Sequence, residues 1–501
     1  MTDWIDRHRW IVLALLSAGL FAAAIVRAFA KPFWHDEIYT ILLAETGSPR
    51  LIWAAFRDGA DQMPPLTSWL TAAIHRVAGT GPLVTRLPAL IGFWIATLAL
   101  FAIVRRRTNV LLGIVAALLL FWTAAFRYSI EARGYGLTLA CAGLALYAWG
   151  EAASPRARAR HRWLLGGALA AGVWTHDYAV LLFLPVVAGE AVRQLRQRQL
   201  DARTWAAIAA AAAVCTPLAL VRIAAAADAG TFWARGEPET LAGLYRFLLN
   251  RLMTTYVGVA LVAALAAAVV VRSIEALRHS AADRGTPLPL HERIAGVVAL
   301  ALPAVALPIA ELAGTGLVAR YVLFALVPIA AAVPIAIGRL APRHTLLHAA
   351  LCACLVVAFG KEVADTFTPG RLAFRNPALA HPLLRAALDQ SDAVAVTGGI
   401  WHLQLWYYSP PEERARIVYL VDPDSAARIL GTDTVDRNFL RLSRYVPIGV
   451  QDYGEFTADR RTFLVLEYGR GWLLQRIEED GGELSVVQMG PGRLLAARLP
   501  R

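Results

Sequence analysis

Cysteine is scarce in this sequence. Only four of its 501 residues are cysteines, and all four lie within long apolar runs: Cys141, Cys215, Cys352 and Cys354. The segment after residue 360 has none, so no disulfide framework supports it. Cys352 and Cys354 are two residues apart and point in different directions on a helix, which argues against a metal-binding pair.

The segment 361–501 also lacks the motifs of the common soluble catalytic domains. It contains no G-x-G-x-x-G or P-loop sequence, no Ser-His-Asp order and no zinc-ligand spacing. The chain as a whole shows no internal repeat. Transporters often have such repeats, so this absence argues against a transporter or lipid flippase, which remains the main alternative class.

Apolar residues, in contrast, are abundant. They make up 57% of the chain, and the mean hydropathy is +0.50. These values indicate a membrane protein. Runs long enough to cross about 30 Å of hydrocarbon recur through the first 360 residues. Eleven membrane-spanning helices are expected near 10–30, 83–104, 110–126, 135–150, 163–174, 179–192, 204–222, 254–271, 294–311, 321–338 and 345–360.

The net charge of +12 reflects membrane topology and not nucleic-acid binding. One set of alternate loops carries 19 Lys and Arg in about 66 residues, and the opposite set carries 10 in about 102. This is the positive-inside pattern, which predicts a cytoplasmic N-terminus and places Lys31 outside. Anionic lipid head groups are a secondary partner. The Ala- and Arg-rich composition favours a GC-rich bacterial genome, hence the bacterial inner (plasma) membrane.

The expected transmembrane domain, 1–360, contains one long outer loop. The first span, about 21 residues long, lacks a small-residue cleavage site and is expected to remain as an anchor. It leads into the loop 31–80, where amphipathic juxtamembrane helices are expected at 36–45 and 66–78. Another surface helix is expected within 223–253. The hairpin 163–192 is short for two crossings, which would place WTHDY (174–178) at membrane depth.

The segment 361–501 is expected to form a small extracytoplasmic α/β domain, since an odd number of spans places it outside. It contains short β-like segments between helical or turn-rich pieces: AVAVTGG, RIVYLVD, TFLVLEYG, LSVVQMG and RLLAARL. WHLQLWYYSPP (401–411) is aromatic enough to contact a membrane or a sugar. A cluster of this kind is more often part of the core, and we expect that role here.

Polar residues gather at the outer ends of the expected spans, where they can share one cavity. Each has a structural alternative: acids favour the first turn of a helix, Glu131 and Arg133 can pair with other helices, and an Arg-Tyr pair is a common interfacial anchor. Their common membrane face favours a reaction with an anionic, membrane-held reactant. The set comprises Asp36, Glu37, Arg127, Tyr128, Glu131, Arg133, Tyr135, His176, Asp177, Tyr178, Arg320 and Tyr321.

The order of these motifs resembles the C-type integral-membrane glycosyltransferases, specifically bacterial relatives of protein O-mannosyltransferases and of lipid A aminoarabinose transferase. The resemblance covers about 1–340. The sequence departs from the family at Met63, where relatives usually have a histidine. The matching motifs are WHDE (34–37), DQMPPLTSW (61–69), GPLVTRLPALIGF (81–93), YSIEARGYGL (128–137) and the pair Arg320-Tyr321.

The resemblance implies a C-type glycosyltransferase fold and transfer of a sugar from a polyprenyl-phosphate donor to an acceptor hydroxyl outside the cytoplasm. The acceptor is a glycan, a lipid or a protein. Asp36 would be the general base and Glu37 a supporting acid. Arg320, by its motif match, and Arg133 would bind the donor phosphate. The remaining expected site residues are Tyr321, Lys31, Glu131, Tyr135, His176 and Asp177.

The chemistry fits these residues. A carboxylate can take the proton of an attacking hydroxyl, and attack opposite the phosphate inverts the anomeric carbon. The leaving phosphate is already anionic, so it needs fixed positive charge and no general acid. No cofactor is expected; a divalent metal held by His35, Asp36, His176 and Asp177 is the weighed alternative. Arabinofuranosyl transfer from a polyprenyl-phosphate donor also stays open.

Overall fold

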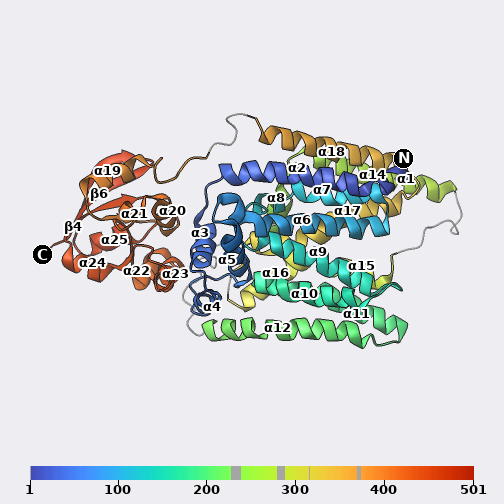
Figure 1. The fold of residues 1–501 in the computed structure, drawn as a ribbon, viewed down its shortest axis with the longest axis horizontal. Helices are drawn as coiled ribbons and strands as arrows, with labels where there is room; N and C mark the ends of the chain where they lie inside the picture. Colours follow the sequence, from blue (N-terminus) through green and yellow to red (C-terminus); the bar gives the residue numbers. More distant parts are fainter. Residues whose placement is uncertain (1, 227–238, 279–287, 315, 369–373, 501) are drawn as a thin grey trace. The chain divides into compact units, whose positions relative to one another are not determined.

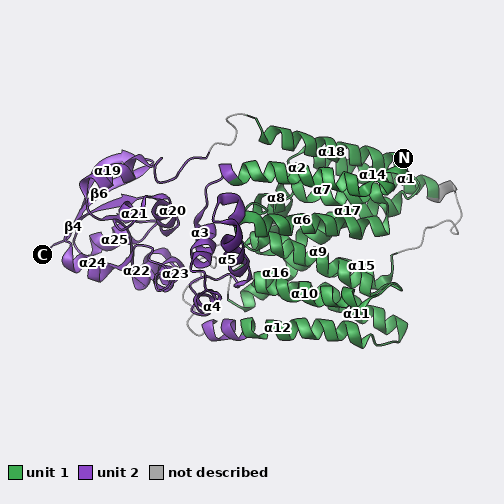
Figure 2. Ribbon diagram, in the orientation of Figure 1, with its two compact units in different colours: residues 1–28, 86–219, 239–372 green, residues 29–85, 220–238, 373–501 purple. Residues whose placement is uncertain are grey.

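The fold comes from a computed structural model, which describes residues 2–226, 239–278, 288–314, 316–368 and 374–500. The chain divides into two compact units, each built from segments far apart in the sequence (Figure 2). Unit 1 comprises residues 1–28, 86–219 and 239–372, and unit 2 comprises residues 29–85, 220–238 and 373–501.

Unit 1 is helical throughout the residues that the structure describes (Figure 1). Among the described residues of this unit, three short stretches are 3₁₀ helices, labelled η. The helices that lie wholly or mainly in this unit are α1 (Thr2–Arg7), α2 (Arg9–Ala30), α6 (Pro82–Arg107), α7 (Val110–Leu119), η1 (Leu120–Trp122), α8 (Ala125–Tyr128), α9 (Tyr135–Ala152), α10 (Ala159–Thr175), η2 (Asp177–Leu182), α11 (Phe183–Gln197), α12 (Ala202–Ala226), α13 (Leu241–Met253), α14 (Tyr256–Arg278), α15 (Leu290–Leu300), α16 (Leu302–Leu312), η5 (Ala319–Ala325), α17 (Leu326–Leu340) and α18 (Thr345–Thr366).

A helix lies at each of the eleven expected spans. Among the described residues, seven helices are long and apolar enough to cross a membrane. The number of such spans rises to eight if the bent pair α15–α16 is counted as one span. The other three expected spans fall on α7, α9 and α10, which do not reach that length or apolarity. The hairpin around WTHDY is longer than expected, because its helices run from Ala159 to Gln197. The chain is an integral membrane protein.

Two motif glycines let helices α6 and α9 approach closely. A Cβ added to Gly136 would lie 2.0 Å from the carbonyl oxygen of Ala89, and one added to Gly92 would lie 2.5 Å from the Gly136 backbone. Only glycine fits such a backbone contact. Small residues at helix contacts are typical of membrane bundles. These glycines therefore fix the start of α9, where Tyr135 lies.

Unit 2 combines three helices of the first outer loop with the C-terminal domain. Helices α3 and α5 confirm the expected helices at 36–45 and 66–78, and five strands match the five expected β segments. The remaining strand of the sheet, β3, was not predicted. The elements are α3 (His35–Glu45), α4 (Pro49–Arg57), α5 (Leu66–Ala78), α19 (Pro382–Gln390), β1 (Val394–Val396), α20 (Gly399–Tyr408), α21 (Pro411–Arg414), β2 (Ile417–Val421), α22 (Pro423–Leu430), α23 (Thr434–Leu442), β3 (Val450–Asp452), α24 (Tyr453–Asp459), β4 (Thr462–Glu467), α25 (Leu473–Glu479), β5 (Glu483–Gly490) and β6 (Gly492–Arg498).

The strands described in unit 2 form one mixed sheet in the order β3-β2-β1-β4-β6-β5. The pairs β3–β2, β2–β1 and β1–β4 are parallel, whereas β6 is antiparallel to both β4 and β5. Every residue of β2 is buried, as expected for a parallel strand covered on both faces. Ile417, Tyr419 and Val421 face one hydrophobic cluster, and Val418 and Leu420 face the other.

The first of these clusters joins the C-terminal domain to the first outer loop. It contains Ile38 and Leu42 of α3 together with Leu403 of α20 and Phe439 of α23. The loop 31–80, expected to belong to the transmembrane domain, thus shares a hydrophobic core with residues 373–501. WHLQLWYYSPP supplies Leu403 to that core, so its predicted role as core is confirmed. Of the surface helix expected within 223–253, α13 is described, whereas Trp233 and Arg235 lie outside the described residues.

Candidate active site

The acidic pair lies in the first turn of α3. Trp34 is the N-cap residue, with extended backbone, and the helix begins at His35. Acidic side chains at this position interact favourably with the positive end of the helix dipole. Asp36 is half-buried, whereas Glu37 is fully buried. The two carboxylates are therefore in different environments, and Asp36 is the one open to solvent.

Glu37 stabilises the start of α3. Its Oε2 accepts a hydrogen bond of 3.3 Å from the backbone N–H of Trp34. The same oxygen lies 3.6 Å from Nζ of Lys31. An N3 glutamate that reaches back to the N-cap amide is half of a capping box. Glu37 thus caps the N-terminus of α3, and Lys31, predicted to bind donor phosphate, contacts Glu37.

In unit 1 the structure gathers predicted site residues from three segments around His176. Its ring centroid lies 5.8 Å from that of Tyr135, 6.0 Å from Tyr178 and 5.1 Å from Tyr321. The backbone N–H of Tyr178 donates to His176 Nδ1 at 3.3 Å. A backbone N–H can only donate, so the neutral ring carries its proton on Nε2. The tyrosines and His176 form one aromatic cluster.

Arg320 is held against this cluster in two ways. Its Nε donates a hydrogen bond of 3.0 Å to the hydroxyl of Tyr135. Its Cζ also lies 5.6 Å from the centroid of the Tyr321 ring. A guanidinium fixed through one edge and one face is already oriented, so it loses little freedom when it binds an anion. Such a planar, oriented donor suits phosphate.

Two further predicted residues, Glu131 and Arg133, lie in the turn between α8 and α9. Both are buried, and the backbone N–H of Arg133 donates to the carbonyl of Glu131 at 2.7 Å. Asp177, half-buried, is the first residue of η2 and follows His176 directly. All of these residues belong to unit 1, whereas Lys31, Asp36 and Glu37 belong to unit 2.

One buried cation was given no role by the sequence analysis. Arg86, in the motif GPLVTRLPALIGF, is fully buried, and its Nη1 donates 2.5 Å to the carbonyl of Ala28. That carbonyl is among the last four of α2, which have no partner within the helix. Arg86 thus caps α2. The motif contained the signal, because a charge flanked by apolar residues within a span demands a partner.

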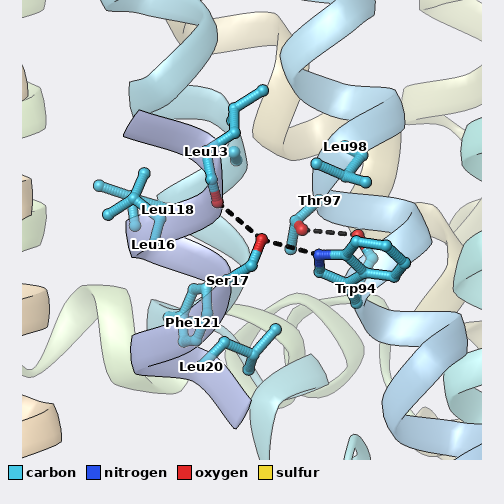
Figure 3. A pocket seen from close by; sticks show the side chains of 10 residues that line it. Leu13, Leu16, Ser17, Leu20, Trp94, Thr97, Leu98, Leu118 and Phe121 are labelled. Atoms are coloured by element: carbon cyan, nitrogen blue, oxygen red, sulfur yellow. Dashed lines mark hydrogen bonds between the residues drawn. The ribbon is translucent and has the colours of Figure 1, made fainter. Parts of the chain in front are cut away.

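A narrow apolar pocket lies between α2, α6 and α7 (Figure 3). Within it the Ser17 hydroxyl donates to the carbonyl of Leu13 at 2.7 Å and accepts from Nε1 of Trp94 at 2.8 Å. Its lining has no ionisable side chain: Leu13, Leu16, Ser17, Leu20, Trp94, Thr97, Leu98, Ala117, Leu118 and Phe121. Over the described residues, no three His, Cys, Asp or Glu side chains are grouped so as to hold a metal ion.

Comparison with known proteins bears on the whole chain. Residues 62–221 match the family model described as dolichyl-phosphate-mannose-protein mannosyltransferase. The crystal structure of ArnT from Cupriavidus metallidurans in the apo state is similar, with 11% identity, coverage of 98% of each chain and a TM-score of 0.62. That of ArnT bound to undecaprenyl phosphate gives 12% identity, 98% coverage of each chain and a TM-score of 0.47. No curated protein sequence matches.

These findings define the class of the protein, which is an integral membrane protein with the C-type glycosyltransferase fold. More particularly, residues 62–221 carry the sequence signature of the mannosyltransferase family. The resemblance predicted from motif order is confirmed. The matched segment includes Glu131, Arg133, Tyr135, His176 and Asp177, and it leaves Asp36 and Arg320 outside.

Proposed function

We propose that the protein transfers a sugar from a polyprenyl-phosphate-linked donor to an acceptor hydroxyl on the extracytoplasmic side of the bacterial inner membrane. The observation that carries the donor class is the match of residues 62–221 to a family named for a dolichyl-phosphate sugar donor. The basic loops favour a cytoplasmic N-terminus and an extracytoplasmic C-terminal domain. The donor sugar is a hexose or a pentose, and the acceptor is a glycan, a lipid or a protein.

Arg320 is the proposed phosphate-binding residue. The Tyr135 hydroxyl and the Tyr321 ring orient its guanidinium before any substrate arrives. Charge that is fixed in advance stabilises a leaving group without reorganisation, and each such donor contributes about 3 kcal/mol. Arg133 is the second proposed cation. It is buried and precedes Tyr135 by two positions in the sequence. Glu131, His176, Asp177 and Tyr321 are proposed to complete the substrate site.

Asp36 is the proposed general base. Its carboxylate takes the proton of the acceptor hydroxyl while that oxygen forms a bond to the anomeric carbon. The bond from this carbon to the phosphate oxygen breaks, and its electron pair leaves with the lipid phosphate. Attack on the opposite face inverts the anomeric centre. Asp36 suits this role better than Glu37 because it is only partly buried, whereas Glu37 is fully buried and contacts Trp34 and Lys31.

The experiment that tests this function is transfer by the purified full-length protein. The protein is incubated with radiolabelled polyprenyl-phosphate sugars and bacterial membrane extract. A labelled covalent product is expected, and its extraction behaviour assigns the acceptor to lipid, protein or glycan. Label that only crosses the bilayer of proteoliposomes, with the donor chemically intact, would instead identify a flippase and overturn the proposal.

A further inference from the structure

The C-terminal domain shares its hydrophobic core with the helix that carries Asp36. Ile38, Tyr39 and Leu42 of α3 lie in one buried cluster with Leu403 of α20 and Phe439 of α23. Helix α20 packs against α3. Since a fully packed cluster transmits small displacements, a change in the C-terminal domain near Phe439 shifts α3.

The contacts converge on the turn that bears Asp36. The Phe439 ring lies 5.9 Å from the ring of His35 and 6.2 Å from that of Tyr39. His35 directly precedes Asp36 in the sequence, and Tyr39 follows Asp36 by three residues. His35 and Tyr39 are four residues apart, so they lie on one face of α3. Phe439 therefore packs on both sequence sides of the proposed base.

A second contact fixes the chain just before the helix. The backbone N–H of Phe33 donates a hydrogen bond of 2.5 Å to the Tyr408 hydroxyl. The Phe33 ring also meets the Tyr407 ring edge-on, with centroids 6.1 Å apart. This segment leads from the first span into α3, so the two tyrosines of α20 hold the chain directly before the helix.

A third contact holds the middle of the loop 31–80, where α4 ends. The Tyr445 hydroxyl donates 2.5 Å to Oδ2 of Asp58, the C-cap residue of α4. At the adjacent Gly59, a Cβ would lie 2.8 Å from Nη1 of Arg441. The backbone there has φ of +75°, a conformation that favours glycine, and the Arg441 side chain covers this turn.

We infer that the C-terminal domain positions the helix bearing the general base, and that Phe439 and Tyr408 are positioning residues for sugar transfer. The inference rests on the proposed function, because it assigns the domain a role in that reaction. Asp36 belongs to the same unit as this domain, whereas the proposed phosphate-binding residues Arg320 and Tyr135 belong to unit 1. Loosening the domain's hold on α3 therefore lowers kcat and leaves donor affinity unchanged.

The test compares matched substitutions on the two faces of the sheet. Phe439→Ala opens a cavity beside α3, and Phe456→Ala opens one in the cluster on the opposite face, where Phe456 packs edge-on against Phe463. Both phenylalanines are buried. Phe439→Ala is expected to lower kcat about tenfold or more, since a misplacement of about 1 Å can cost about 100-fold. Phe456→Ala is expected to change kcat less than about twofold.

Tyr408→Phe is the gentler variant, because it keeps the ring and removes only the hydroxyl that accepts from Phe33. It is expected to lower kcat severalfold with the KM for donor unchanged. Hydrogen exchange of the α3 amides, followed by mass spectrometry, provides a readout independent of activity. Exchange in residues 38–45 should accelerate in Phe439→Ala and in Tyr408→Phe, and should stay at the wild-type rate in Phe456→Ala.

The two proposals fail in different ways. If α3 exchanges equally in Phe439→Ala, Phe456→Ala and the unsubstituted protein, the positioning inference is overturned whatever the transfer assay gives. Equal losses of kcat in Phe439→Ala and Phe456→Ala would also overturn it, because the domain would then act only through its general stability. Absence of transfer by the unsubstituted protein would overturn the proposed function instead.

Discussion

Arg320 and Tyr135, 185 positions apart in the sequence, meet through a hydrogen bond of 3.0 Å from the guanidinium Nε to the phenol oxygen. The Tyr135 ring in turn meets the Tyr128 ring edge-on, with centroids 5.0 Å apart, and its centroid lies 5.8 Å from that of the His176 ring. A single arginine is thus oriented by a cluster of aromatic residues. This orientation is what makes it suitable for a phosphate.

Substitution of this pair should weaken use of the donor. Arg320→Ala is expected to lower kcat/KM for the donor by about 100-fold, as expected for loss of a preorganised donor of about 3 kcal/mol. Tyr135→Phe, which keeps the ring, should cost about tenfold. Arg196→Ala is the matched control, since it removes an exposed arginine of the same unit that has no proposed role in the site. Equal losses in Arg196→Ala and Arg320→Ala would refute a specific role for Arg320.

Glu37 should contribute mainly to the stability of α3. Glu37→Ala removes both the acceptor for the Trp34 amide and the ion pair with Lys31, and we expect a loss of about 1 kcal/mol in unfolding free energy. Glu37→Gln keeps an acceptor oxygen for the amide and should recover part of this loss. Denaturant unfolding in detergent measures both. A Glu37→Gln variant less stable than Glu37→Ala would contradict the capping role.

Asp436 should make the C-terminal domain less stable as pH rises from about 4 to about 6. Burial raises the pKa of its carboxyl from 3.8 to about 6, although it accepts hydrogen bonds from Trp472, Tyr419 and the Asp422 amide. The folded domain then retains a proton that the unfolded chain releases. The stabilisation from this proton is fully present below the pKa of the unfolded chain, and it is lost as pH rises through the pKa of the folded domain. The loss is at most about 3 kcal/mol.

Thermal unfolding of the full-length protein at about pH 4.5 and about pH 7 tests this dependence. The Asp436→Asn variant has no titrating group at this position, so its stability should change less between the two pH values than that of the unsubstituted protein. The same pH dependence in both proteins would show that Asp436 is not its source.

Gly136 should be intolerant of a side chain. Gly136→Ala places a Cβ 2.0 Å from the Ala89 carbonyl, which forces α6 and α9 apart, and overpacking of this kind costs about 1–3 kcal/mol or more. Gly167→Ala in α10 is the control, since nothing lies within 4 Å of its added Cβ; it should be neutral or stabilising. The yield of monodisperse protein and its melting temperature distinguish the two. A Gly136→Ala protein as stable as Gly167→Ala would contradict the close helix contact.

The helices and most strands could be predicted because their signals are local. Apolar runs predicted a helix at each span, and β-branched segments predicted strands such as Ile417–Val421. Strand β3, Val450–Asp452, was not predictable in the same way. It has three residues and only one is apolar, so its extended form depends on pairing with β2.

The long-range contacts had no such signal. The predicted topology puts Tyr135 and Arg320 on one membrane face, but it does not predict their hydrogen bond. Likewise, nothing in the periodicity of residues 31–80 indicates that Phe33 meets Tyr408, 375 positions away. Loop 31–80 was therefore grouped with the spans that flank it, whereas its buried side chains, such as Ile38, pack with those of the C-terminal domain. A buried charge such as Arg86 can be recognised in the sequence because apolar residues flank it, but the sequence does not indicate which group it contacts.

The most direct test of the account is a comparison of Asp36→Asn with Asp392→Asn, the same substitution at an exposed position of the C-terminal domain. Single-turnover transfer from a radiolabelled polyprenyl-phosphate sugar and equilibrium binding of that donor are measured for both variants. The account predicts that Asp36→Asn binds donor like the unsubstituted protein but transfers sugar about 100- to 10,000-fold more slowly, while Asp392→Asn is unchanged. Full transfer activity in Asp36→Asn would show that Asp36 is not the general base.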